Sequence, residues 1–136
     1  MLPIRVSSTR SHYQQQIGIR QFQFAADEPI EVGGADTGPT PTEYVLAGLG
    51  ACKTMTIQMY AERKGWPVEK ISVDVTLEKT PDGTQVHALL TLEGDLTDEQ
   101  RQRMKEIGDR CPVHKLLSSS LTIQTTLKQK EDRPTN

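Results

Sequence analysis

Two cysteines are the residues of this sequence best suited to redox chemistry. Cys52 and Cys111 are the only cysteines among its 136 residues. A cysteine thiolate attacks a peroxide oxygen and becomes a sulfenic acid, which condenses with a second thiol to form a disulfide. The alternative is that both thiols pack in the core as small hydrophobic side chains. Both interpretations stay open here, because a sequence does not show whether two sulfur atoms meet.

The two cysteines differ in how well their positions favour a thiolate. Pro112 follows Cys111, so Cys111 is expected to begin a short helix whose free amide groups favour a negative charge. Cys52 falls in the middle of a predicted helix, which offers no such donors. Because a free cysteine has a pKa of about 8.5, we expect that a cation from another part of the fold must activate Cys52.

The histidines give weaker signals. Cys111 and His114 have the spacing of half a metal site, but a site normally takes three or four protein ligands. His12 and His87 lie on predicted strands without paired spacing. We therefore predict no metal. His114 and Lys115 are interpreted as loop or surface residues, with assistance to the Cys111 thiolate as the alternative.

Charge and composition exclude several classes of function. The chain has 16 basic and 18 acidic side chains, which are mixed along the sequence and give a formal charge of −2. Such a chain produces no positive field that would gather nucleic acid. No apolar run approaches the roughly 20 residues that cross a bilayer, and no export signal is recognisable at the start. We expect a soluble, cytoplasmic protein whose thiols are kept reduced, with no membrane partner.

A long helix is predicted over residues 41–64. Thr40 and Glu43 form a capping box at its start, and Gly65 ends it. Residues at alternating spacings of four and three lay one face along this helix. That face consists of Val45, Leu49, Cys52, Thr56 and Met59. We expect the helix to be central and largely buried.

Alternating apolar residues predict strands on both sides of this helix. The parity of the apolar positions switches near residues 18–20, which splits the second stretch into two strands. Turn-forming residues make 27–39 a loop, and a second helix with its own capping box leads to Cys111. The expected strands are 2–9, 12–17, 20–26, 71–77, 86–92 and 121–127. The order is βββαββαβ, which is an α+β fold.

One domain is expected over residues 1–136, with 128–136 as a flexible tail. Only 35% of the residues are apolar and 4% are aromatic, so the long helix must supply much of the core. Gly48 and Gly50 would let a second backbone approach that helix closely. These features predict a homodimer.

Four runs of the sequence form a specific combination. They are AADEP at 25–29, GGADTGPTPTEYVLAGLGAC at 33–52, YAERKG at 60–65 and CPVHKLL at 111–117. Together they resemble the OsmC/Ohr family of osmotically inducible and organic hydroperoxide resistance proteins, with agreement in motif order over residues 12–127. The resemblance implies an OsmC-like fold, with curved antiparallel sheets around a long cysteine-bearing helix. It also implies an intertwined homodimer with two active sites at the subunit interface.

The same resemblance implies a reaction and its residues. Cys52 would be the peroxidatic cysteine and Cys111 the resolving cysteine of a thiol-dependent peroxidase that reduces organic hydroperoxides in oxidative-stress defence. An arginine from the N-terminal strands, for which Arg20 is the candidate, would hold the thiolate and polarise the peroxide together with a glutamate. The alternative for Arg20 is a solvated residue at a strand end. No cofactor is implied, and the external reductant would be a dithiol or a lipoylated protein.

The candidate glutamate, Glu43, is where the sequence departs from the organic hydroperoxide branch of the family. In that branch the acid directly follows the proline, a place that Thr42 holds here. The spacing from Glu43 to Cys52 is about two and a half helical turns, which puts the two on opposite faces. The capping box explains Glu43 without any chemistry. Less characterised branches of the family do carry glutamate at this later position, so a catalytic role stays open.

A function of a different class also fits the sequence. A dimeric binding protein for an apolar or electrophilic small molecule would use the apolar helix face as its site. Its cysteines would be packed, or would bind covalently without turnover. The displaced Glu43 favours this alternative, and catalytic oxidation of a thiol reductant by peroxide distinguishes the two functions.

Overall fold

The computed structural model describes residues 1–130 and begins with a three-stranded antiparallel sheet. Its strands are β1 (Arg5–Ser8), β2 (Gln15–Ile19) and β3 (Phe22–Ala26), in that order across the sheet. Ile17 of β2 lies opposite Phe24 of β3, so both side chains share one face. The predicted switch in parity is confirmed as the tight β2–β3 turn at Arg20, whose φ of 53° is left-handed.

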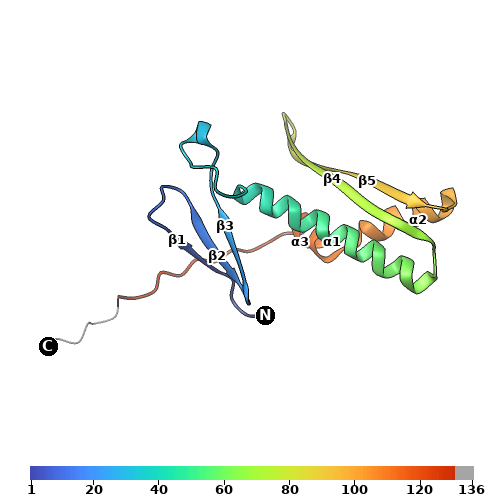
Figure 1. The fold of residues 1–136 in the computed structure, drawn as a ribbon, viewed down its shortest axis with the longest axis horizontal. Coiled ribbons are helices and arrows are strands. Elements are labelled where there is room, and N and C mark those ends of the chain that lie inside the picture. The colour runs from blue at the N-terminus through green and yellow to red at the C-terminus, as the bar shows by residue number, and fades with distance from the viewer. Residues whose placement is uncertain (131–136) are drawn as a thin grey trace.

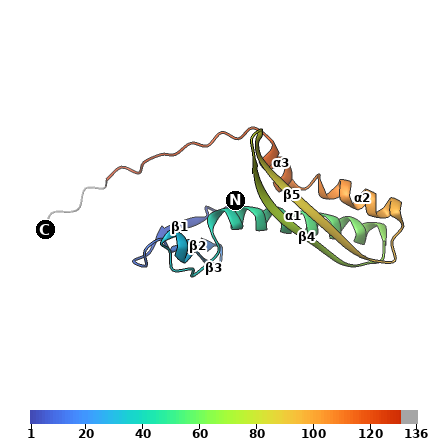
Figure 2. The same ribbon diagram turned by 90° about the horizontal axis from the view of Figure 1, so that it is seen from above.

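The rest of the fold is a long hairpin laid along helices. The helices are α1 (Pro41–Lys64), α2 (Asp98–Gly108) and α3 (Pro112–Ser118), and the strands are β4 (Val68–Thr80) and β5 (Gly83–Gly94). The β4–β5 hairpin runs along α1, and the three N-terminal strands lie beyond the start of that helix (Figures 1 and 2). Antiparallel sheets and helices together make the predicted α+β fold.

A loop fixed by hydrogen bonds leads from β3 into α1 and contains the short 3-10 helix η1 (Ile30–Val32). The carboxylate of buried Asp27 accepts hydrogen bonds from the hydroxyl and the backbone N–H of Thr37, at 2.6 and 3.0 Å. The hydroxyl bond is the main reason why the pKa of Asp27 is lowered. The Tyr44 hydroxyl donates to the carbonyl of Ala25 at 2.7 Å, which ties the first turn of α1 to the end of β3.

Both predicted capping boxes are confirmed. Thr40 Oγ1 accepts from the Glu43 N–H at 3.2 Å, and Glu43 Oε1 accepts from the Thr40 N–H at 2.8 Å. Thr97 and Gln100 make the same pair of bonds at the start of α2. Gly65 ends α1 with a φ of 69°. Among residues 1–130, no helix is both long and apolar enough to cross a membrane.

A small core lies between α1, α2 and the hairpin. Ile57 and Ala61 of α1 and Met104 of α2 are fully buried in it. Partly buried residues pack around them: Trp66, Val68, Ile71, Leu90, Leu92 and Leu96. Ile107 and Cys111 are buried as well.

The prediction of which face of α1 is buried is wrong for the single chain. Val45 and Met59 are 50% and 62% exposed, whereas Leu49 is buried. The buried residues of the helix are Leu49, Gly50, Lys53, Ile57 and Ala61. The helix is apolar on more than one side, and the hairpin with α2 covers only one of them.

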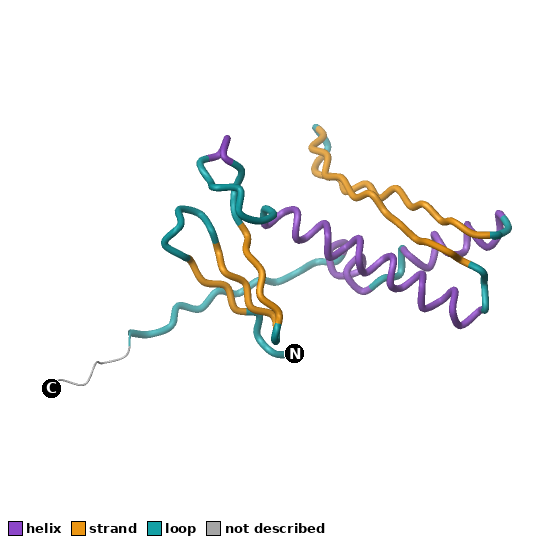
Figure 3. The backbone as a smooth tube through the Cα atoms, in the orientation of Figure 1, coloured by secondary structure: helices purple, strands orange, loops and turns teal. Residues whose placement is uncertain are grey.

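The strand predicted at 121–127 is also wrong for the single chain. That segment is extended but pairs with no strand among the described residues, and Figure 3 shows it leading away from the helices. Leu121, Ile123 and Leu127 are 52%, 84% and 91% exposed. The alternating pattern is present, but a strand needs a neighbouring edge to pair with. Of the predicted tail, 131–136 lie outside the described residues.

Candidate active site

The packing of α3 against α1 brings the two cysteines together. Cys52 lies in the middle of α1 and is partly buried, whereas Cys111 is the N-cap residue of α3 and is fully buried. Both are free thiols. Burial raises the pKa of Cys111, and the adjacent Cys52 thiol raises it further. The fold thus supplies the proximity that the sequence could not show.

Two groups act on Cys111 in the opposite direction. Its sulfur accepts a hydrogen bond from the backbone N–H of His114 at 3.3 Å, and the positive charge of Lys53 also favours the thiolate. Burial is the largest effect, so the pKa of Cys111 is raised overall. The expectation that Cys111 begins a short helix is confirmed, but its amide groups are outweighed by desolvation.

A lysine is buried beside the cysteines, and its burial was not predicted from the sequence. Lys53 Nζ lies 3.3 Å from the carbonyl oxygen of Gly108, 3.2 Å from Asp109 Oδ1 and 2.8 Å from His114 Nδ1. The side chain of Lys53 is 8% exposed. The available signal was its spacing of four from both Leu49 and Ile57, which places it on the buried stripe of α1.

The charges around Lys53 come from α2, α3 and the turn between them. Burial acts to raise the pKa of Asp109, but the hydrogen bond and charge of Lys53, with Lys105, outweigh it, and this pKa is lowered. Lys105 Nζ lies 3.4 Å from Asp109 Oδ2. His114, interpreted from the sequence as a surface or loop residue, is half-buried in α3 and holds Lys53. Among residues 1–130, no three His, Cys, Asp or Glu side chains are grouped to hold a metal.

Arg20 is not brought to the cysteines within one chain. It lies in the exposed β2–β3 turn, with its guanidinium carbon 5.0 Å from the centre of the Phe22 ring. No hydrogen bond or ion pair joins it to another side chain in the described part of the chain. A role for Arg20 at a cysteine stays a prediction that requires a second subunit.

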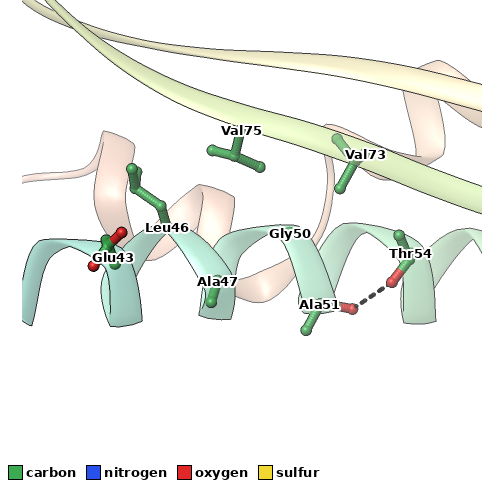
Figure 4. Close-up of a pocket in the computed structure, with 8 residues that line it drawn as sticks. All are labelled: Glu43, Leu46, Ala47, Gly50, Ala51, Thr54, Val73 and Val75. Atoms are coloured by element: carbon green, nitrogen blue, oxygen red, sulfur yellow. Dashed lines mark hydrogen bonds between the residues drawn. The ribbon is translucent and has the colours of Figure 1, made fainter. Parts of the chain in front are cut away.

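Glu43 lies at a groove between α1 and β4 of about 440 Å³, shown in Figure 4. The groove is lined by Glu43, Leu46, Ala47, Gly50, Ala51, Thr54, Val73 and Val75. Neither cysteine is among these residues, in agreement with the expectation that Glu43 and Cys52 occupy different faces. The hairpin crosses α1 at Gly50. A Cβ at this position would lie 3.3 Å from methyl groups of Val73 and Val75, so a glycine allows the close approach.

The fold and the two neighbouring free cysteines are those of an OsmC-type protein. The chain belongs to the OsmC-like protein family, whose sequence model matches residues 33–126. No curated protein matches the chain.

Solved structures share this fold at low sequence identity. One is described as an osmotic stress induced and detoxification response protein from Psychrobacter arcticus, with 20% identity, a TM-score of 0.73, and coverage of 85% of this chain and 88% of that chain. An OsmC-like protein from Mycoplasma pneumoniae has 21% identity, a TM-score of 0.72 and 85% coverage of each chain. The organic hydroperoxide resistance protein OhrB of Bacillus subtilis has 21% identity, a TM-score of 0.59, and coverage of 85% and 89%.

Proposed function

We propose that this protein is a thiol-dependent peroxidase that reduces organic hydroperoxides. The observation that carries the proposal is the adjacency of two free thiols that differ in exposure. Cys52 is the more accessible and would meet the peroxide, whereas fully buried Cys111 would meet only its neighbour. The organic hydroperoxide resistance protein with the same fold supports the substrate class.

The proposed cycle uses both sulfurs and an external reductant. The Cys52 thiolate attacks the distal peroxide oxygen, the O–O bond breaks, and the leaving alkoxide takes a proton to become an alcohol. Cys52 is left as a sulfenic acid. The Cys111 thiolate attacks the Cys52 sulfur, the S–S bond forms, and hydroxide leaves and is protonated to water. A dithiol or a lipoylated protein then reduces the disulfide to two thiols and is itself oxidised.

We propose that the protein acts as a homodimer. A compact monomer of this mass exposes about 7,100 Å², whereas the isolated chain of 15.2 kDa exposes 11080 Å². The difference of about 4,000 Å² is more than a stable dimer needs to bury. The excess includes apolar residues on α1, on β3 and in the C-terminal arm 119–130, and a second copy would cover them. Those residues include Val45, Met55, Met59, Phe22, Phe24, Ile123 and Leu127.

Peroxide consumption with a dithiol tests the proposal. We expect tert-butyl hydroperoxide to be consumed over many turnovers with dihydrolipoamide. Cys52→Ser should abolish consumption, and Cys111→Ser should allow one oxidation of Cys52 and then stall. No turnover with any alkyl hydroperoxide, together with saturable binding of an apolar ligand, would support the binding protein instead.

A further inference from the structure

A charged residue occupies the middle of the buried stripe of α1. Leu49 precedes Lys53 by one turn and Ile57 follows it by one turn, and both are buried. A buried ammonium group is costly unless it is paired and hydrogen-bonded. An apolar side chain would satisfy the helix pattern at this position equally well. The charge of Lys53 therefore requires an explanation beyond packing.

Lys53 has three N–H donors on Nζ, and each has one acceptor within hydrogen-bonding distance. Its acceptors are the Gly108 carbonyl, a carboxylate oxygen of Asp109 and Nδ1 of His114. An ammonium group has only donors, so His114 Nδ1 must be the acceptor in the 2.8 Å bond. The ring proton of a neutral His114 is thereby placed on Nε2.

All three acceptors lie on the segment that carries Cys111. Gly108, Asp109 and His114 flank Cys111 on both sides, while Lys53 directly follows Cys52 in the sequence. The side chain of Lys53 thus joins the part of α1 that carries Cys52 to the segment that carries Cys111. It is also the cation whose charge acts on the Cys111 sulfur.

No other element supplies a competing charge at this point. The cavities beside Lys53 are lined by hairpin residues that are uncharged: Val73, Thr84, Val86, Ala88 and Leu90. The remaining charges are those of Asp109 and Lys105, which face each other at 3.4 Å. Among the residues that the structure describes, Lys53 is therefore the one buried cation in the cluster around the two cysteines.

We propose that Lys53 is a positioning residue of the resolving step, which holds the Cys111 segment against α1 and supplies the positive charge that favours the Cys111 thiolate. This role rests on the proposed peroxidase cycle. In that step Cys111 loses its proton to solvent, its sulfur forms the bond to Cys52, and hydroxide departs. Lys53 keeps its own protons throughout, and the same charge stabilises Cys111 when a reductant releases it as a leaving thiolate.

The first test measures the charge effect without any peroxide. Thiolate absorbance is titrated against pH in reduced Cys52→Ser protein, alone and combined with Lys53→Met or Lys53→Arg. The Cys52→Ser/Cys111→Ser double variant gives the tyrosine background to subtract. We expect Lys53→Met to raise the pKa of Cys111 by about 1 to 3 units, and Lys53→Arg to keep it near the value of the Cys52→Ser parent. A folded Lys53→Met protein with an unchanged titration curve would overturn the proposal.

A second variant covers the case in which Lys53→Met does not fold. Asp109 is about half exposed, so Asp109→Asn is tolerated more readily. Removing this carboxylate leaves the charge of Lys53 less neutralised, and we expect the pKa of Cys111 to fall. Unfolding would also expose Cys111 and lower its pKa, so the titration is compared only for protein whose near-UV circular dichroism matches that of the parent. In folded Asp109→Asn protein, an unchanged or raised pKa would contradict the proposal.

The kinetic test separates this proposal from the proposed function. With Cys52 present, one equivalent of tert-butyl hydroperoxide should form sulfenic acid in Lys53→Met, as trapping with dimedone reports, and its conversion to disulfide is followed as a separate step. Disulfide formation should then be slowed about tenfold or more, as expected from the loss of thiolate. Equal disulfide rates in both proteins would refute the role of Lys53. Absence of both sulfenic acid and disulfide in the two proteins would refute the peroxidase cycle, and the titration would still decide on the charge effect.

Discussion

The backbone N–H of His114 donates a hydrogen bond of 3.3 Å to the sulfur of Cys111. The sulfur is nevertheless fully buried, and burial raises the pKa of this thiol more than the bond and the nearby Lys53 lower it. In the resting protein Cys111 is therefore held as a thiol. The partly exposed Cys52 is left as the sulfur that meets a substrate first.

The raised pKa of Cys111 predicts how resolution depends on pH. Below that pKa the thiolate fraction grows about tenfold per pH unit. Disulfide formation after one equivalent of alkyl hydroperoxide should therefore accelerate from neutral to alkaline pH and level off above the pKa of Cys111. Stopped-flow tryptophan fluorescence or quenched mass analysis measures this rate. A rate that is flat or falls with pH would show that the Cys111 thiolate is not the attacking species.

The capping box at the start of α1 predicts that Glu43 contributes to stability and not to the peroxide step. Thr40→Ala should lower the free energy of unfolding by about 1 kcal/mol, and Glu43→Ala should lower it in the same direction because the reciprocal bond is lost. Thr97→Ala is the matched change at α2. Urea unfolding gives the stabilities, and the rate of Cys52 oxidation gives the chemistry.

Comparison of the two α1 variants decides the role of Glu43. If Glu43 is only a cap, Glu43→Ala and Thr40→Ala should have similar, small effects on Cys52 oxidation. Slowing of that step by Glu43→Ala far beyond the effect of Thr40→Ala would show a direct role for the carboxylate.

Arg20 does not contact a cysteine of its own chain, so any action on Cys52 must cross a dimer interface. We expect Arg20→Met to make the Cys52 thiol less reactive and to slow the peroxide step much more than it affects stability, because a charge-assisted partner of the thiolate is lost. Alkylation of Cys52 at a series of pH values measures the thiol in both proteins. Arg10→Met is a control, because Arg10 is also exposed near the N-terminal strands.

Mixed dimers test whether Arg20 acts across the interface. A subunit with Arg20→Met is combined with a subunit with Cys52→Ser. Action across the interface predicts that the mixture regains peroxide consumption, because the second subunit supplies its arginine to the intact Cys52 of the first. A mixture as inactive as its two parents would show that Arg20 does not act across the interface.

Exposed apolar residues on α1 predict a dimer interface, and one charged substitution in that interface should disrupt the dimer. Sedimentation equilibrium should give about twice the chain mass of 15.2 kDa. Met55 is 61% exposed on this helix, and Met55→Lys should shift the protein toward monomer because a lysine would be buried in the interface. Gln102→Lys on α2 is the control. A wild-type monomer that stays folded at micromolar concentration would contradict the dimer.

Local sequence predicted the features that depend on near neighbours. The two capping boxes, the glycine end of α1 and the hairpin formed by β4 and β5 all depend on residues close in the sequence. The buried side of α1 was predicted wrongly, because packing by the hairpin and α2 decides it among several apolar sides. The strand at 121–127 failed because its pairing edge is not supplied by the described chain.

The candidate site likewise has a part that was predicted from local sequence and a part that depends on tertiary packing. The motifs indicated Cys52 and Cys111, but only the packing of α3 on α1 shows that the thiols are neighbours. The burial of Lys53 was not predicted, because a lysine does not fit a search for apolar periodicity even when its stem and charge are buried. Its partners Asp109 and His114 are far from it in the sequence, so no local pattern joins them.

The most direct test of the two-cysteine mechanism is mass mapping of the protein after one equivalent of tert-butyl hydroperoxide. Digestion under non-reducing conditions should yield a peptide pair joined by a Cys52–Cys111 disulfide, with one alcohol released per disulfide formed. The pair should form within one chain and should vanish in Cys111→Ser, where Cys52 is recovered as a sulfenic acid. Recovery of both cysteines as free thiols after exposure to the peroxide would contradict the mechanism.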